Sequence, residues 1–143
     1  MKKNTIQDHA SLALRVSIGS ILLAHGLMKV LIFTIPGTVA FFGSIGFPPV
    51  IAHLTIWGEI LGGIALLAGF HTRLVAILSL PILVGATWVH SGNGWVFSNE
   101  GGGWEFPALL VILTVIVVIQ GSGSFALKGI PQVNSRLPGW LKS

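Results

Sequence analysis

The sequence contains no cysteine among its 143 residues. Disulfide bonds, thiol catalysis, iron–sulfur ligation and cysteine-based zinc sites are therefore excluded. Charged residues are also scarce, because Asp, Glu, Lys and Arg make up only 8% of the chain, whereas a soluble domain has about 25%. So few charges cannot cover a surface that faces water. The sequence therefore predicts an integral membrane protein in contact with the lipid bilayer.

The basic residues outnumber the acidic ones by 8 to 4. They are scattered and form no basic patch or stripe, so nucleic acid is not expected as a partner. Two lysines near the N-terminus are typical of a signal peptide. However, the apolar segment that follows is long, contains Arg15 and Lys29, and has no evident small-residue cleavage motif. We therefore expect a retained first span.

The chain length predicts one domain. Four apolar segments predict an all-α fold, a four-helix transmembrane bundle over residues 1–127 followed by a polar, partly disordered cytoplasmic tail over 128–143. The four predicted spans cover residues 10–35, 51–70, 74–90 and 105–120. Pro36-Gly37 should end the first span and Pro81 should kink the third.

Residues 36–50 carry no charge and are rich in Gly, Pro and Phe. They predict a re-entrant or interfacial segment with irregular backbone over the mouth of the bundle. If there are four spans, one side holds Lys2, Lys3, Arg73, Lys128, Arg136 and Lys142. The positive-inside rule then places both termini in the cytoplasm. The opposite, outer ends hold Trp57, Trp88, Trp95 and Trp104, which are typical of an interfacial aromatic belt.

Helical spacing places particular residues on shared faces. In the first span, the residues that share a face are Arg15, Gly19, Leu22, Gly26 and Lys29. In the second span, a stripe of small residues, which permits close helix packing, consists of Gly58, Gly62, Ala65 and Gly69. Arg15 and Lys29 are separated by roughly 21 Å at about 1.5 Å per residue, so they should lie near opposite membrane surfaces.

Glu59 is an acid within an apolar segment, where an ionisable group is costly and needs a partner. At the same predicted depth, the first span offers Lys29 and His25, the third His90 and the fourth Glu105. We therefore predict an ion pair between Lys29 and Glu59, with the two histidines and Glu105 nearby. At the other membrane surface, Gln120 is the expected neighbour of Arg15.

Structural interpretations of the same residues stay open. The Lys29–Glu59 pair can be a lock between two helices, and His25 can be a hydrogen-bonded structural residue. Glu105 can be a helix N-terminal acid, and Arg15 can extend to the headgroups. His9 and His53 are expected at the interface. Nothing else supports a haem pocket around His25 and His90, so neither haem nor a metal is expected.

Four sequence stretches resemble the DoxX family of small four-span bacterial membrane proteins. They are LRVSIGSILLAHGLMKV, GEILGGIALLAGFHTR, the isolated His90 and GGGWEFPALL. The residues that match recurrent family positions are Arg15, His25, Gly26, Lys29, Gly58, Glu59, Gly62, Gly63, Thr72 and Arg73. After the GSGS segment the family usually continues Ser-Leu-Asp, whereas this chain reads Ser-Phe-Ala-Leu-Lys. The resemblance implies a four-helix bundle in the bacterial cytoplasmic (inner) membrane, and a membrane subunit of a redox system.

The leading hypothesis is a cavity in the outer half of the bundle that binds a quinone head group. Lys29 or His25 would hydrogen-bond a quinone oxygen, and Glu59 or His90 would exchange the proton that accompanies electron transfer. Trp57 and Glu105 are further candidate binding residues. The chain has no visible redox centre, so a partner redox protein or subunit should supply the electrons. The alternatives are a non-catalytic membrane anchor or assembly subunit, and a small transporter or lipid-binding module; the packing faces also permit a homo-oligomer.

Overall fold

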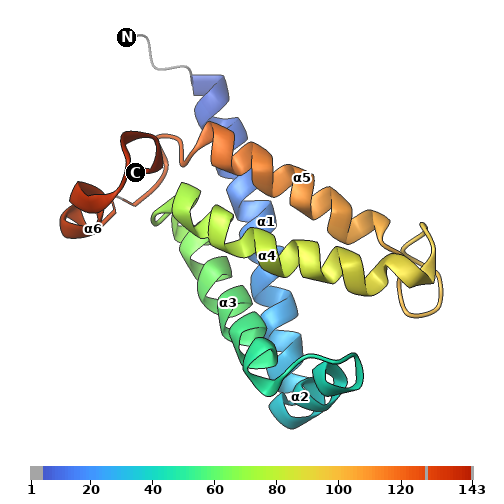
Figure 1. Ribbon diagram of the computed structural model, residues 1–143. Helices are drawn as coiled ribbons and strands as arrows, with labels where there is room; N and C mark the ends of the chain where they lie inside the picture. Colours follow the sequence, from blue (N-terminus) through green and yellow to red (C-terminus); the bar gives the residue numbers. More distant parts are fainter. Residues whose placement is uncertain (1–4, 128, 143) are drawn as a thin grey trace.

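A computed structural model of the protein describes residues 5–127 and 129–142. Within these residues the secondary structure is helical (Figure 1), which confirms the all-α prediction. The α-helices are α1 (Thr5–Leu31), α2 (Ile35–Ser44), α3 (Pro49–Ala68), α4 (Thr72–His90), α5 (Glu105–Gln120) and α6 (Pro131–Arg136). Two short 3₁₀ helices are η1 (Ser91–Asn93) and η2 (Gly139–Leu141).

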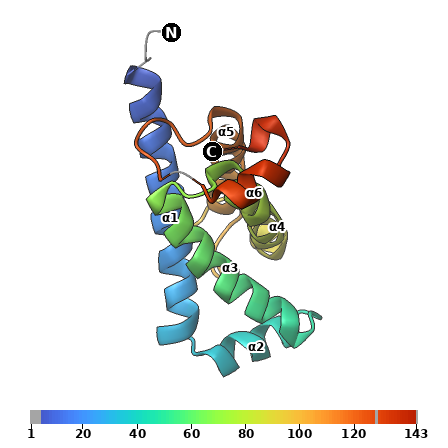
Figure 2. The ribbon, with the colours of Figure 1, turned by 90° about the vertical axis from the view of Figure 1, so that its left-hand side faces the viewer.

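The long helices form two packed pairs, α1 with α3 and α4 with α5. The two pairs cross steeply, and they diverge toward the Leu31 end of α1 and the His90 end of α4 (Figure 1). In the view turned by 90°, α2 bridges the diverging ends of α1 and α3 (Figure 2). The backbones of the two helix pairs therefore form a wedge, which widens at the end where the sequence places the outer ionisable residues.

Glycine determines how closely α1 and α3 approach. A Cβ atom added to Gly63 would lie 2.6 Å from the backbone nitrogen of Leu23, and one added to Gly19 would lie 2.9 Å from the carbonyl oxygen of Gly63. Of the five residues that helical spacing places on one face of α1, Arg15, Gly19, Leu22 and Gly26 are buried and Lys29 is half-buried. Glycine at these positions lets the two backbones touch.

The small-residue stripe predicted on α3 partly faces a different helix. A Cβ atom on Gly58 would meet the Ile82 side chain of α4 at 2.7 Å, and one on Gly62 would lie 3.3 Å from the hydroxyl of Ser79. These two glycines therefore accommodate α4, whereas Gly63, one position further along, accommodates α1. Gly69, the last member of the stripe, caps α3 in the left-handed conformation, with φ 72°.

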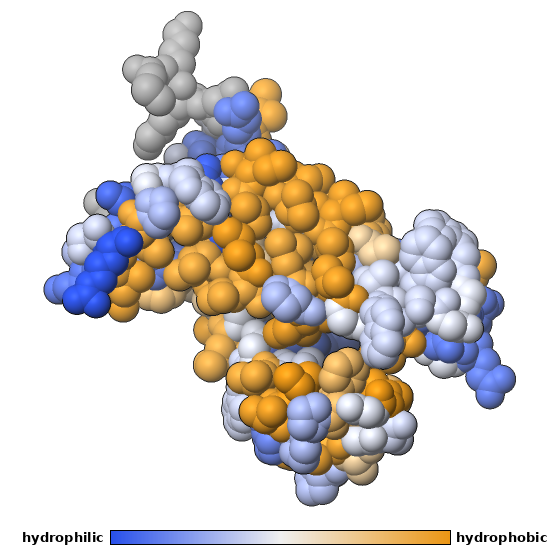
Figure 3. All heavy atoms as spheres, viewed as in Figure 1, coloured by the Kyte–Doolittle hydropathy of each residue, from blue (hydrophilic) through white to orange (hydrophobic). Residues whose placement is uncertain are grey.

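The core joins both helix pairs and consists of Ile18, Leu22, Leu66, Ala76, Leu83, Leu110 and Val117. Large apolar side chains also cover much of the outside (Figure 3), including Leu61 on α3, Leu78 on α4 and Ile119 on α5. An extensive exposed apolar surface is suited to lipid rather than to water. The protein is therefore a helical membrane protein, as its composition predicts.

Within the described part of the chain, three helical segments are long and apolar enough to cross a membrane: 5–31, 49–68 and 72–93. The fourth predicted span, α5, has 16 residues, or about 24 Å at ~1.5 Å per residue. This length is less than the ~30 Å of a typical hydrocarbon core. That α5 crosses the membrane stays a prediction, as does the cytoplasmic location of both termini. Lys2, Lys3 and Lys128, which contribute to that orientation, lie outside the described residues.

The segment 36–50 differs from its prediction. Residues 35–44 form helix α2, not irregular backbone, and α1 ends at Leu31, before Pro36. The hydroxyl of Thr34 caps α2 by accepting a hydrogen bond from the backbone N–H of Gly37 at 3.2 Å. Pro36 lies in the first turn of α2, where its missing N–H costs nothing. Pro36 therefore begins a helix here, although its position predicted only a helix end.

Arg15 is buried, with 1% of its surface exposed. Its guanidinium donates to the carbonyl oxygens of Leu66 at 3.0 Å, Leu67 at 2.7 Å, and Phe125. These contacts correct two expectations, because Arg15 neither extends to the headgroups nor pairs with Gln120, whose side chain is exposed. Arg15 instead satisfies carbonyls at the C-terminus of α3, which have no partner within the helix.

The described residues of the C-terminal tail contain the short helices α6 and η2. The backbone N–H of Ile130 donates to Nε2 of the buried His71 at 3.0 Å. Arg73 donates to the carbonyl oxygens of Trp140 and, at 3.3 Å, of Ile119. The turn between α3 and α4 therefore holds the tail, a role that the sequence did not indicate for His71.

Candidate functional site

The ion pair predicted between Lys29 and Glu59 is confirmed. Lys29 lies in the last turn of α1 and Glu59 near the middle of α3. The ammonium nitrogen of Lys29 lies 2.8 Å from Oε2 and 3.0 Å from Oε1 of Glu59. The exposed fractions of the two side chains are 18% and 8%. The two charges therefore compensate each other in a place from which most solvent is excluded.

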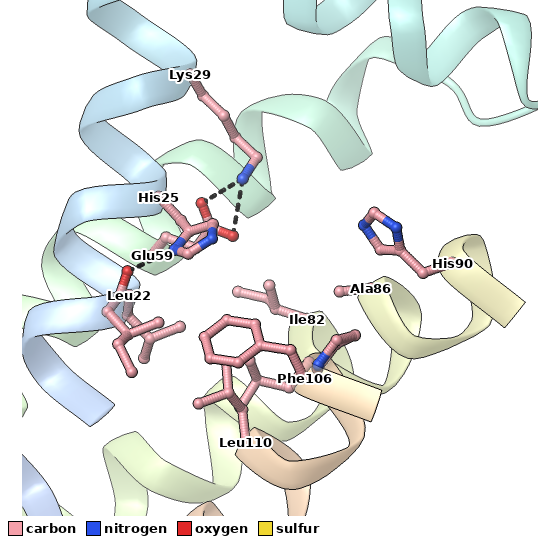
Figure 4. Close-up of a pocket in the computed structure, with 12 residues that line it drawn as sticks. Leu22, His25, Lys29, Glu59, Ile82, Ala86, His90, Phe106 and Leu110 are labelled. Carbon is pink, nitrogen blue, oxygen red and sulfur yellow. Dashed lines mark hydrogen bonds and ion pairs between the residues drawn. The ribbon is translucent and has the colours of Figure 1, made fainter. Parts of the chain in front are cut away.

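A cavity of about 140 Å³ lies next to this pair, in the wedge between the two helix pairs (Figure 4). We call it the inner cavity. Its lining residues come from α1, α3, α4 and α5, and they are Ile21, Leu22, His25, Lys29, Glu59, Ile82, Leu83, Ala86, His90, Phe106, Pro107 and Leu110. A cavity of roughly 150 Å³ in another protein accommodates one benzene ring. The inner cavity is therefore suited in size to a single six-membered ring.

A larger cavity of about 650 Å³ adjoins the first and shares His25, Lys29 and His90 with it. We call it the outer groove. Its other lining residues, from α1, α2 and the turn between them, are Met28, Phe33, Gly37, Thr38, Phe41 and Phe42. Figure 3 shows a hollow between the two lobes of the molecule with hydrophilic surface inside it. The groove is apolar and aromatic except at its shared end, where the ionisable residues lie.

The two histidines of the prediction, His25 and His90, both line the inner cavity. Nδ1 of His25 lies 2.8 Å from the carbonyl oxygen of Ile21, one turn earlier in α1. The ring of His25 also stacks on Phe106 of α5, with 6.4 Å between the ring centres. His90 is the last residue of α4, and its Nδ1 lies 2.9 Å from the carbonyl oxygen of Gly102. The candidate catalytic residues Glu59, Lys29, His25 and His90 therefore lie around one cavity, although they come from three helices.

The other two predicted binding residues lie elsewhere. Trp57 is not among the residues that line either cavity, and 47% of its surface is exposed. Glu105 accepts a hydrogen bond from the backbone N–H of Phe97 at 2.9 Å and so stabilises the loop between α4 and α5. This loop also provides the carbonyl group that holds His90. Glu105 therefore contributes to the site through the loop and not by lining a cavity.

Sequence reasoning missed the aromatic residues that complete the site. Phe106 lies against His25, and Phe41 and Phe42 of α2 line the outer groove. The available signal was the concentration of phenylalanine in residues 36–50, which the prediction placed over the bundle mouth without assigning a surface to it. Among the described residues, no group of three or more His, Cys, Asp or Glu side chains could hold a metal ion.

The helical fold, the apolar exterior and the buried ion pair together define a small helical membrane protein. Within that class, the chain belongs to the DoxX family, whose family model matches residues 10–92. This match covers α3, α4 and most of α1, including all four ionisable residues of the inner cavity.

Two curated bacterial proteins are similar to the chain. A Bacillus subtilis (strain 168) protein named "Putative oxidoreductase CatD" is 34% identical over 117 residues, which cover 82% of this chain and 83% of that protein. A Haemophilus influenzae protein of uncharacterised function is 28% identical over 92 residues, which cover 63% of this chain and 59% of that protein. No solved structure matches the chain.

Proposed function

We propose that this protein is a membrane subunit of a redox system, and that its inner cavity binds the head group of a quinone or a similar small molecule. One observation carries this proposal: Lys29, Glu59, His25 and His90 line one cavity of ring size. The cavity adjoins an apolar, aromatic groove. Ligand sites are typically apolar pockets with a few convergent polar groups. The name of the Bacillus subtilis relative, which refers to an oxidoreductase, agrees with this chemistry.

The residues present fit a quinone. The ring would occupy the inner cavity beside Phe106, and an isoprenoid tail would follow the outer groove along Phe41 and Phe42. Lys29 can donate a hydrogen bond to a quinone oxygen, since its ammonium group has three N–H donors. Glu59 and His90 can accept or release the proton that accompanies electron transfer to or from a quinone. The chain has no cysteine, so we propose that a partner redox protein exchanges the electrons.

The test is to purify the protein from native membranes in mild detergent and to measure bound quinone and lipid by mass spectrometry. Glu59→Gln removes the carboxylate charge of the cavity, and Glu100→Gln makes the same change at an exposed position of the loop. We expect near one quinone per chain in the native protein and in Glu100→Gln, and a loss of about tenfold or more in Glu59→Gln at equal yield. Lipid without quinone in all three proteins would contradict the proposal.

A second candidate function, a non-catalytic anchor or assembly subunit, is favoured by the way that the ion pair joins α1 to α3. In that case Lys29 and Glu59 serve only to hold the two helices together. The double variant Lys29→Glu/Glu59→Lys would then restore the abundance that either single change lowers. No bound ligand would be found in any of these proteins. If the proposed redox function is correct, the double variant regains abundance but not bound quinone, because the ammonium and carboxylate have exchanged places in the cavity.

A further inference from the structure

His25 and His90 make the same kind of hydrogen bond, although they lie on different helices. In each ring Nδ1 faces backbone carbonyl oxygens: Ile21 for His25 at 2.8 Å, and Gly102 and Gly101 for His90 at 2.9 and 3.0 Å. A carbonyl oxygen can only accept, so Nδ1 must carry the proton in both rings. In a neutral imidazole the second nitrogen, Nε2, is then a bare acceptor.

Neither Nε2 atom has a hydrogen-bond partner among the described residues. Both rings line the inner cavity, His25 from α1 and His90 from α4 on its other side (Figure 4). The cavity therefore has, on opposite walls, two imidazole nitrogens that a ligand can reach. A ligand that donates a hydrogen bond to an acceptor in the wall of a cavity binds with a more favourable free energy than a ligand that leaves this acceptor unpaired.

The protein fixes the orientation of His90 by an ordered loop. The backbone N–H of Gly103 donates to the carbonyl of Val96, and Glu105 accepts from Phe97. Gly101 and Gly102 both have φ 77°, a left-handed conformation that favours glycine. This loop holds the two carbonyl groups against Nδ1 of His90. Glu105 therefore stabilises the same loop that carries these two carbonyl groups.

The remaining polar groups of the cavity are mostly acceptors as well. Glu59 offers carboxylate oxygens, and Lys29 already directs hydrogen bonds to both of them. The ammonium group of Lys29 keeps one further N–H for a ligand. The cavity therefore offers a ligand more acceptors than donors.

We propose that the inner cavity prefers the reduced, dihydroxy form of its ligand to the oxidised, dicarbonyl form, with ligand hydroxyl groups donating to Nε2 of His25 and Nε2 of His90. This preference rests on the proposed function for the class of ligand, and it adds the redox state of that ligand. A hydroquinone has two O–H donors, whereas a quinone has only acceptors and leaves both imidazoles unpaired. Sites that are built to bind a hydroxyl group discriminate strongly against analogues that lack it.

The experiment compares three probes on the purified protein in lipid nanodiscs under anaerobic conditions. The probes are 2-decylhydroquinone, 2-decyl-1,4-benzoquinone and the dimethyl ether of the hydroquinone, which keeps the ring and tail but has no O–H. Affinity is measured by calorimetric titration against empty nanodiscs. We expect the hydroquinone to bind at least about tenfold more tightly than the other two, as the loss of one hydrogen bond predicts.

Variants then assign the preference to the two rings. We expect His25→Phe and His90→Phe to reduce the ratio between hydroquinone and quinone affinities toward one. The control His53→Phe removes an exposed histidine from α3 and should leave the ratio unchanged. The comparison of probes on the native protein needs no variant, so the result stands even if a variant fails to fold.

The possible outcomes distinguish the preference for the reduced form from the proposed function. Equal or tighter binding of the quinone would overturn the preference for the reduced form and leave the proposed function in place. Hydroquinone and its dimethyl ether binding equally would show that hydroxyl donors are not recognised, which overturns the same preference. If none of the three probes binds above the empty-nanodisc control, the proposed function itself fails.

Discussion

Arg15 and Lys29 lie on the same buried face of α1, yet the fold satisfies them in different ways. Lys29 pairs with a carboxylate beside a cavity. Arg15 instead donates to backbone carbonyls at the C-terminus of α3 and to Phe125. The partial negative charge of a helix C-terminus favours a cation there. Arg15 therefore stabilises the fold, whereas Lys29 is available for chemistry.

We predict that Arg15→Met destabilises the protein by about 1–3 kcal/mol, because the part-buried carbonyl groups of Leu67 and Phe125 lose the guanidinium as their donor. The apolar methionine offsets part of this loss, since it removes a buried charge. Arg136→Met is the matched control, since Arg136 is exposed in α6, and it should change stability by less than about 0.5 kcal/mol. Reversible unfolding in mixed detergent measures both. Equal stability of the two variants would contradict the assigned role of Arg15.

Sequence reasoning at the residue scale succeeded where side chains pair with side chains. Glu59 is an acid in an apolar helix, Lys29 lies at a matching depth, and the structure joins them. The partners of Arg15 and His71 were missed because they are backbone groups. A backbone carbonyl or N–H belongs to every residue and so leaves no signature in the sequence.

At the scale of helices, the contact between α1 and α3 depends on glycine at positions that no side chain can occupy. Gly63 is the critical position, because its missing Cβ lies within 2.6 Å of backbone in α1. The helical period predicted a glycine-lined face on α3, but it did not tell which neighbour each glycine accommodates. That depends on how α3 is rotated between α1 and α4, and only the packing of the whole bundle decides this rotation.

We predict that Gly63→Ala lowers stability by about 1–3 kcal/mol, because the added methyl group forces the two helices apart. Gly85→Ala in α4 is the control, since nothing lies within 4 Å of its added Cβ. It should raise stability by about 0.5–1 kcal/mol through its higher helix propensity. Thermal unfolding of both variants in the same detergent measures the two changes in stability. A stabilising Gly63→Ala would show that α1 and α3 do not pack as described.

At the scale of the whole molecule, the crossing of the two helix pairs creates the wedge that contains both cavities. No local pattern predicts such a crossing, since each helix alone has only an apolar sequence with a few polar residues. Whether all four predicted spans cross the membrane also depends on how the whole bundle sits in the bilayer, because α5 has only 16 residues. Its ends would have to sink into the interface or the bilayer would have to thin around it.

We predict that the loop between α4 and α5 and the C-terminal tail lie on opposite sides of the membrane. The absence of native cysteine allows a direct test with Ser98→Cys in the loop and Ser135→Cys in the tail, both exposed. A membrane-impermeant maleimide should label only Ser98→Cys in intact cells or spheroplasts, and both variants after permeabilisation. Labelling of both variants before permeabilisation would show that α5 does not cross the membrane.

Photoaffinity labelling can detect a quinone head group in the inner cavity without any substitution in the protein. A photoreactive azidoquinone with a decyl tail is cross-linked to the protein in native membranes, and the labelled peptides are mapped by mass spectrometry. We expect adducts within residues 25–29 and 41–42, which decline when unlabelled quinone is added in excess. Adducts that are spread over the lipid-facing side chains of Leu61, Leu78 and Ile119, or that excess quinone does not reduce, would contradict this expectation.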